Sequence, residues 1–189
     1  MNKNKKLREI FSIPNIIGYC RILMLPVFLM QYNRAETTRE YIAAFVVLAV
    51  IFLSDMADGY ISRKFDMVTN LGKILDPVAD KLVQGTLVLA VTLKHPLMKV
   101  FLAVFLCREI YMGAMGLYLI KCKNSLNGAK WYGKIYTAVM DACILVMLFF
   151  PGLSDTVSNL LIVLMIVVGV FSWIMYIRFH VEILKDQNS

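Results

Sequence analysis

The sequence contains few charged residues. Charged residues make up 17% of the 189 residues and hydrophobic residues make up 59%, whereas an average soluble protein carries about 25% charged residues. This deficit argues against a soluble domain and favours an integral membrane protein. The chain is too short for a large soluble domain beside a membrane region, so we expect a single domain over residues 1–189.

Cysteine is also scarce, and it is scattered. Cys20, Cys107, Cys122 and Cys143 form no CxxC pair and no spacing with histidine that suits zinc. We interpret them as small packing residues in a reducing compartment. The sequence further lacks an internal repeat, a low-complexity tract and a signal-peptidase site after its first apolar run, so the basic N-terminus is expected to stay in the cytoplasm.

Six apolar segments approach the roughly 20 residues that a membrane-spanning helix needs. They cover residues 14–32, 41–61, 75–94, 98–120, 132–151 and 157–178. We therefore predict an all-α integral membrane protein with six transmembrane helices. A short amphipathic helix is expected on the membrane surface over residues 3–12, and Pro77 is expected in the first turn of the third span.

Four aspartates stand at the ends of two of these segments. An acidic side chain at the bilayer centre costs about 2.5–3.5 kcal/mol on insertion scales, so such residues mark functional sites. Asp55 and Asp58 are three residues apart, and Asp76 and Asp80 are four apart, so each pair lies on one helix face. Two antiparallel helices can thus present four carboxylates to one small volume.

Four carboxylates this close repel one another unless a cation lies among them. Oxygen-only ligands favour Mg²⁺ or Mn²⁺, and two such ions are a common arrangement for displacement at phosphorus. Gly59 lets a ligand approach the backbone, and the planar guanidinium of Arg63 suits a phosphate. Two other interpretations stay open. One is a transport pathway for cations or protons, and the other is a set of ion pairs with Arg63, Lys64, Lys73 and Lys81.

Lysine and arginine are divided unevenly between the two sides of the predicted bundle. With the N-terminus inside, the outer loops hold only Arg34, Arg39, Lys94 and Lys99. The positive-inside rule then puts the aspartates on the cytoplasmic side of what we expect to be a bacterial cell membrane. Topology and attraction to anionic lipid headgroups explain the net charge of +7, so nucleic acid is not an expected partner.

The polar stretch around the aspartates resembles a known signature. Residues 55–80 read Asp-x2-Asp-Gly-x2-Ser-Arg-x8-Gly-x3-Asp-x3-Asp, which is similar to the D-x2-D-G-x2-A-R-x8-9-G-x3-D-x3-D pattern of the CDP-alcohol phosphotransferase family. Every spacing matches, and Ser62 in place of alanine is the one departure. The six-helix layout and the Pro14-Asn15 pair at the start of the first span extend the resemblance over almost the whole chain.

This resemblance implies a metal-dependent transfer of a phosphatidyl group from CDP-diacylglycerol to an alcohol, with release of CMP. It implies that Asp55, Asp58, Asp76 and Asp80 hold two Mg²⁺ or Mn²⁺ ions and that Asp80 is also the general base. The residues that it assigns to the nucleotide are Asp58, Gly59, Ser62, Arg63 and Gly72. It also suggests a homodimer.

The acceptor alcohol must be recognised by other residues. Arg21, Arg108, Lys130 and Lys134 lie toward the expected cytoplasmic ends of three helices and predict a basic pocket for a phosphate-bearing acceptor. The run from Lys130 to Met140 resembles the G-K-x-K-T-x-x-Q stretch of bacterial phosphatidylglycerophosphate synthases through Gly133, Lys134 and Thr137.

Two residues depart from that stretch, because Tyr136 replaces its second lysine and Met140 replaces its glutamine. We predict glycerol-3-phosphate as the acceptor. Phosphatidylglycerol, the acceptor of a CMP-forming cardiolipin synthase, and other alcohols of the family stay open as alternatives. An aspartate-rich prenyltransferase is a further alternative, but it predicts a different spacing and a larger bundle.

Overall fold

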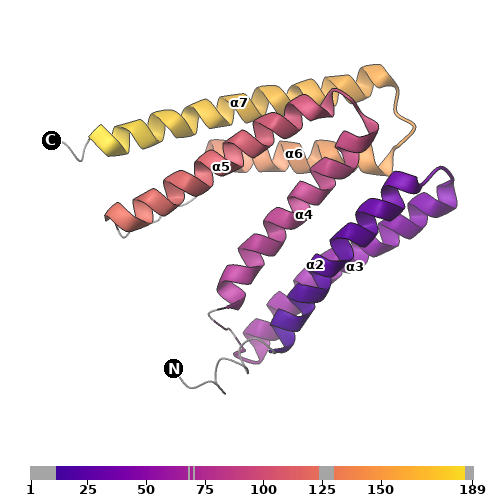
Figure 1. The fold of residues 1–189 in the computed structure, drawn as a ribbon, viewed down its shortest axis with the longest axis horizontal. Coiled ribbons are helices and arrows are strands. Elements are labelled where there is room, and N and C mark those ends of the chain that lie inside the picture. Colours follow the sequence, from indigo (N-terminus) through magenta and orange to yellow (C-terminus); the bar gives the residue numbers. More distant parts are fainter. Residues whose placement is uncertain (1–11, 68, 70, 124–129, 186–189) are drawn as a thin grey trace. The chain divides into compact units, whose positions relative to one another are not determined.

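The structure, a computed structural model, describes residues 12–67, 69, 71–123 and 130–185, and within these ranges all regular elements are helices (Figure 1). They are α2 (Ile13–Arg34), α3 (Thr38–Lys64), α4 (Gly72–Lys94), α5 (Met98–Lys123), α6 (Trp131–Phe149) and α7 (Asp155–Lys185). Each predicted span is thus found as a helix. The amphipathic helix predicted over residues 3–12 lies, apart from Ser12, outside the described residues.

Among the described residues, five helices are long and apolar enough to cross a membrane, namely α2, α3, α5, α6 and α7. Leu23, Met56 and Ile110 are between 70% and 72% exposed, as expected for side chains that face lipid rather than water. The chain is therefore an integral membrane protein. The first half of α4 carries Lys73, Asp76, Asp80 and Lys81, and the sixth span predicted there stays a prediction.

The helices belong to two compact units, Met1–Ala90 and Val91–Ser189. In the first unit, α2 and α3 lie side by side (Figure 1), with Phe28 and Ile51 completely buried. In the second unit, α7 packs against both α5 and α6. The boundary between the units falls within α4, and the single domain predicted over residues 1–189 stays a prediction.

Local hydrogen bonds explain where α3 begins. The Glu40 N–H donates to Thr37 Oγ1 at 3.4 Å, and the Thr37 N–H donates to Glu40 Oε2 at 3.0 Å. This capping box satisfies two amide donors at the helix start. At α4 the prediction for Pro77 is wrong, because the helix begins at Gly72 and the proline lies in its second turn.

Candidate active site

The two aspartate pairs flank the turn that joins α3 to α4. Asp55 and Asp58 stand near the C-terminal end of α3, and Asp76 and Asp80 stand in the first turns of α4. Between the helices, Asp66 has a φ of 49°, a left-handed conformation that aspartate tolerates better than most residues. Because the connection is short, both pairs lie at the same end of the first unit.

Arg21 of α2 contacts three of the four aspartates. Its Nη1 atom donates to carboxylate oxygens of Asp55 at 2.5 Å and of Asp80 at 3.4 Å, and its Nη2 atom donates to Asp58. The Arg21 side chain is 1% exposed. The acids thus form ion pairs with Arg21, which is not one of the cations that the sequence alternative named, namely Arg63, Lys64, Lys73 and Lys81.

The aspartates of this network differ in their access to solvent. The Asp58 side chain is 7% exposed, whereas the side chains of Asp55 and Asp80 are 49% and 63% exposed. Asp58 therefore anchors the network inside the unit, while a ligand from outside can reach the carboxylates of Asp55 and Asp80.

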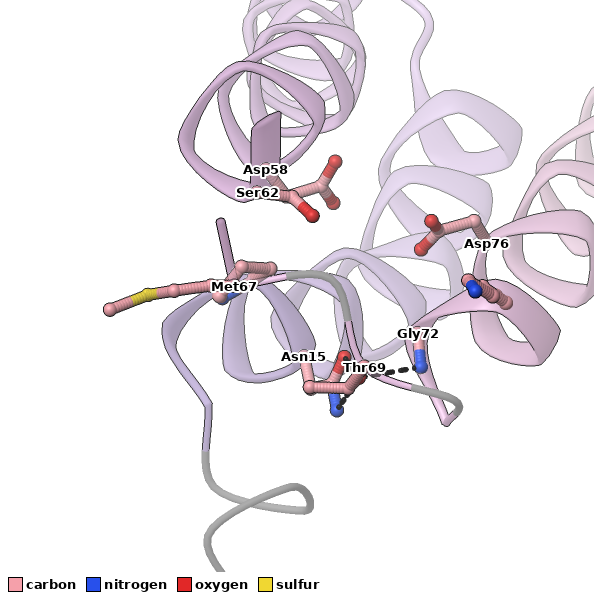
Figure 2. A pocket seen from close by; sticks show the side chains of 9 residues that line it. Asn15, Asp58, Ser62, Met67, Thr69, Gly72 and Asp76 are labelled. Carbon is pink, nitrogen blue, oxygen red and sulfur yellow. Dashed lines mark hydrogen bonds between the residues drawn. The ribbon is translucent and has the colours of Figure 1, made fainter. Parts of the chain in front are cut away.

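A pocket lies beside the network, with walls from α2, α3 and α4. Figure 2 shows Asp58 and Ser62 on one wall and Asp76 on another, with both carboxylates turned toward the space between them. The lining residues are Pro14, Asn15, Asp58, Ser62, Met67, Thr69, Gly72, Lys73 and Asp76. Asp58, Ser62 and Gly72, which were predicted to contact the nucleotide, therefore share one pocket.

Hydrogen bonds connect the start of α4 to α2. The Gly72 N–H donates to Thr69 Oγ1 at 2.9 Å, and Asn15 Nδ2 donates to the same oxygen at 3.2 Å (Figure 2). The Thr69 hydroxyl thus caps the helix that carries Asp76. Neither Asn15 nor Thr69 was predicted to belong to the site, although a polar residue in an apolar span and a threonine shortly before a helix are recognisable signals.

Gly59 and Arg63 lie on successive turns of α3, outside the pocket lining. Arg63 Nε donates to the Gly59 carbonyl at 3.0 Å, so its guanidinium group lies along its own helix. A Cβ atom at Gly72 would lie 3.0 Å from Thr69 Oγ1 and 3.1 Å from Asn15 Oδ1. Position 72 therefore favours glycine over residues with a Cβ atom, because Thr69 and Asn15 pack closely against it.

In the second unit, aromatic and polar side chains enclose Arg108 of α5, which is 5% exposed. Its guanidinium carbon lies 4.1 Å from the ring centre of Tyr136 and 5.7 Å from that of Tyr176, within cation–π range. Its Nη1 atom donates to Glu109 Oε1 at 2.7 Å, and its Nη2 atom donates to Ser172 Oγ at 3.5 Å. Arg108 is therefore held by side chains from three helices.

Lys130 and Lys134 lie at the start of α6. The Lys130 N–H donates to the Tyr176 hydroxyl at 3.3 Å, and Lys134 is exposed one turn further on. Of the four residues predicted for the acceptor, Arg108 and Lys130 thus contact the same tyrosine. Arg21 belongs to the first unit, where it contacts the aspartates.

The carboxylates of the first unit suit a hard divalent cation by their chemistry. They offer only oxygen ligands, and three of them already converge on one positive group. Within the described part of the chain, no three acidic, histidine or cysteine side chains are spaced as metal ligands. The acids are arranged around a guanidinium group, which is larger than a metal ion.

Comparisons with known proteins agree with the signature. The family model described as CDP-alcohol phosphatidyltransferase matches residues 11–181, a range that includes α2 to α6 and most of α7. The match therefore covers all the aspartates and all the basic residues considered above.

Several proteins named CDP-diacylglycerol--glycerol-3-phosphate 3-phosphatidyltransferase are similar to this chain. Those from Rickettsia bellii and Rickettsia prowazekii are 34% identical over 116 residues, which cover 61% of this chain and 63% of each relative. The one from Escherichia coli (strain K12) is 27% identical over 146 residues, which cover 76% of this chain and 80% of the relative. The chain thus spans slightly less than two thirds of the length of the Rickettsia relatives.

Proposed function

The chain belongs to the CDP-alcohol phosphatidyltransferase family, and from this membership we propose that it transfers a phosphatidyl group from CDP-diacylglycerol to glycerol-3-phosphate. The products are phosphatidylglycerophosphate and CMP. The relatives from Rickettsia bellii and Escherichia coli are named for a transfer between these two substrates.

The facing carboxylates of Asp58 and Asp76 support this proposal most directly. They come from the two helices of the signature and line one pocket (Figure 2), while Asp55 and Asp80 adjoin it through Arg21. A metal ion that binds a diphosphate needs acidic ligands next to a pocket that can hold the diphosphate. Asp58 and Asp76 provide such acids in the wall of this pocket.

Asp55, Asp58, Asp76 and Asp80 are the residues that we assign to two Mg²⁺ or Mn²⁺ ions. When bound, such ions offset the negative charge that develops on the attacked phosphate and on the leaving CMP. The residues assigned to the nucleotide are Asp58, Gly59, Ser62, Arg63 and Gly72, and three of them line the pocket.

Asp80 is assigned as the general base. Its side chain is 63% exposed, so an acceptor hydroxyl can come within hydrogen-bond reach of the carboxylate. The acceptor oxygen then forms a bond to the phosphorus that carries diacylglycerol, and Asp80 takes the hydroxyl proton. The bond from that phosphorus to the CMP oxygen breaks, and CMP leaves with the electron pair.

Arg108, Lys130 and Lys134 are assigned to the phosphate of the acceptor, because Lys130 and Arg108 both contact Tyr176 and Lys134 lies one turn further along α6. Arg21, whose guanidinium is bonded to three aspartates, is left out of this group. The positive-inside rule supports a site on the cytoplasmic side of a bacterial cell membrane. The family membership supports a homodimer.

One observation favours a second acceptor, phosphatidylglycerol. Tyr136 stands where the synthase stretch has a lysine, and its ring covers the guanidinium of Arg108 at 4.1 Å. The acceptor region therefore has one cation fewer for a free phosphate group. With phosphatidylglycerol as the acceptor, the product is cardiolipin.

Asp80→Asn tests the assigned chemistry, because it removes the base while keeping the shape of the side chain. We expect CMP release from CDP-diacylglycerol and glycerol-3-phosphate to fall at least about a hundredfold, the usual contribution of a general base. Asp66→Asn is the control, since it changes an exposed aspartate of the same region and asparagine also tolerates a positive φ. Substantial turnover by Asp80→Asn would contradict the assignment.

A further inference from the structure

Arg21 occupies a position that neither the nucleotide nor the acceptor explains. It stands in the middle of an apolar helix and is 1% exposed, and its two terminal nitrogens bond carboxylates from two other helices. A buried cation without partners is very costly, and so is a group of acids without a cation. Arg21 and the aspartates therefore stabilise one another.

The Arg21 guanidinium group forms ion pairs with three carboxylates, but its hydrogen-bonding capacity is not fully used. Among the described residues, its Nε–H group has no hydrogen-bond partner although it is buried, which leaves a donor unsatisfied. Asp76 is the one aspartate of the four to which Arg21 makes no described hydrogen bond.

The contacts also overlap with the groups that a metal ion needs. Arg21 bonds Asp55, Asp58 and Asp80, three of the four acids assigned to metal. A carboxylate oxygen that binds a divalent ion directly has less negative charge left to offer the guanidinium, and the two cations repel each other. Both can be fully bound at the same carboxylates only at an energetic cost.

We propose that Arg21 is an internal counter-ion that competes with the divalent metal for the aspartates. In the metal-free protein it holds the three carboxylates together, and it must release at least one of them when metal binds. Arg21 is thus a positioning residue that keeps the site assembled between metal-binding events and weakens metal affinity. This inference rests on the metal site of the proposed function.

Solvent access supports such an exchange without unfolding. The side chains of Asp55 and Asp80 are 49% and 63% exposed, so an ion can reach two of the bonded carboxylates from outside. Asp58, which is 7% exposed, keeps the guanidinium anchored while the other bonds open.

The test compares Mn²⁺ binding by the full-length wild type, Arg21→Gln and Arg34→Gln, each purified in detergent and freed of metal with a chelator. The electron paramagnetic resonance signal of free Mn²⁺ measures affinity, and thermal unfolding with and without Mn²⁺ measures stability. Arg34→Gln is the matched control, because it removes an arginine about 20 Å further along α2.

Without metal, Arg21→Gln is expected to unfold at a lower temperature than the wild type. It is also expected to bind Mn²⁺ at least about tenfold more tightly, because the metal no longer has to displace a charge-assisted hydrogen bond from a carboxylate. Mn²⁺ should remove most of its deficit in unfolding temperature. Arg34→Gln should keep wild-type affinity. If Arg21→Gln does not fold, Arg21→Lys is used in its place. One ammonium group cannot bond three carboxylates in the same geometry, so the affinity for Mn²⁺ should still rise.

Equal or weaker Mn²⁺ binding by the Arg21 variants, with normal binding by the wild type, overturns the inference and leaves the proposed function standing. A wild type that binds no Mn²⁺ and releases CMP in excess chelator overturns the metal site itself, and the competition with it.

Discussion

Gly133 of α6 lies against the Tyr176 hydroxyl of α7. A Cβ atom at this position would overlap that oxygen, and Tyr176 is 5% exposed, so its ring has little room to move. Gly133→Ala is therefore expected to destabilise the protein by about 1–3 kcal/mol. For a chain of this length this corresponds to a fall in Tm of several degrees, on the order of 2–4 °C per kcal/mol, measured by thermal unfolding in detergent.

Gly113→Ala on α5 is the matched control for that substitution. No described heavy atom lies within 4 Å of a Cβ atom added at Gly113, and alanine favours a helix over glycine by about 1 kcal/mol. Its Tm should therefore equal or exceed that of the wild type. If the two alanine variants unfold at the same temperature, the close contact of Gly133 with Tyr176 is not present in the protein.

At the scale of single residues, the aspartates could be predicted because acids beside apolar spans are costly and their spacing puts each pair on one helix face. The contacts of Arg21 could not be predicted in this way. Its partners are 34, 37 and 59 residues away in the sequence. An arginine inside an apolar span indicates that a counter-ion exists, but only the folded arrangement identifies its partners, which lie on α3 and α4.

At the scale of elements, the start of α4 depends on a cap from Thr69. Thr69→Val keeps the shape of the side chain and removes the oxygen that accepts from Gly72 and Asn15. We expect a loss of about 1 kcal/mol of helix stability, faster hydrogen exchange at the Gly72 amide, and slower CMP release because Asp76 is held less firmly.

Thr69→Ser should restore both the slow exchange and the CMP release, since serine caps a helix at least as well as threonine. Thr86→Val on the same helix serves as the control, because the Thr86 hydroxyl donates to the Leu82 carbonyl one turn before it and does not cap the helix start. Unchanged exchange at Gly72 in Thr69→Val would show that the hydroxyl does not cap α4.

Helices could be predicted from the sequence because each long apolar run has the length of a membrane span. Their ends were harder to predict. The first turn of α4 lies in the polar stretch between two spans, and its cap is fixed by Asn15, 54 residues from Thr69. For this reason the sequence suggested a later start for α4 and put Pro77 in the wrong turn.

At the scale of the whole molecule, the distribution of lysine and arginine predicts which side of the membrane holds the site. In a variant without native cysteines, a membrane-impermeant maleimide added outside intact cells should label Glu36→Cys, between α2 and α3. It should not label Phe65→Cys, just after α3, until the cells are opened. Both positions are exposed, so reversed labelling would contradict the predicted orientation.

The identity of the acceptor is the part of the function that the sequence determines least. Gly133, Lys134 and Thr137 favour glycerol-3-phosphate, whereas Tyr136 and Met140 depart from the same stretch. The structure adds that Tyr136 is packed on Arg108, a contact between α6 and α5 that no local pattern predicts. The two acceptors therefore have to be compared directly.

The most direct test measures CMP release by the purified protein with CDP-diacylglycerol, Mg²⁺ and one acceptor at a time. Glycerol-3-phosphate, phosphatidylglycerol, inositol, serine and choline are compared at equal concentration, and the lipid product is identified by mass spectrometry. The proposed function predicts that glycerol-3-phosphate gives the fastest release and yields phosphatidylglycerophosphate. Release with phosphatidylglycerol alone would contradict glycerol-3-phosphate as the acceptor, and no release with any alcohol would contradict phosphatidyl transfer itself.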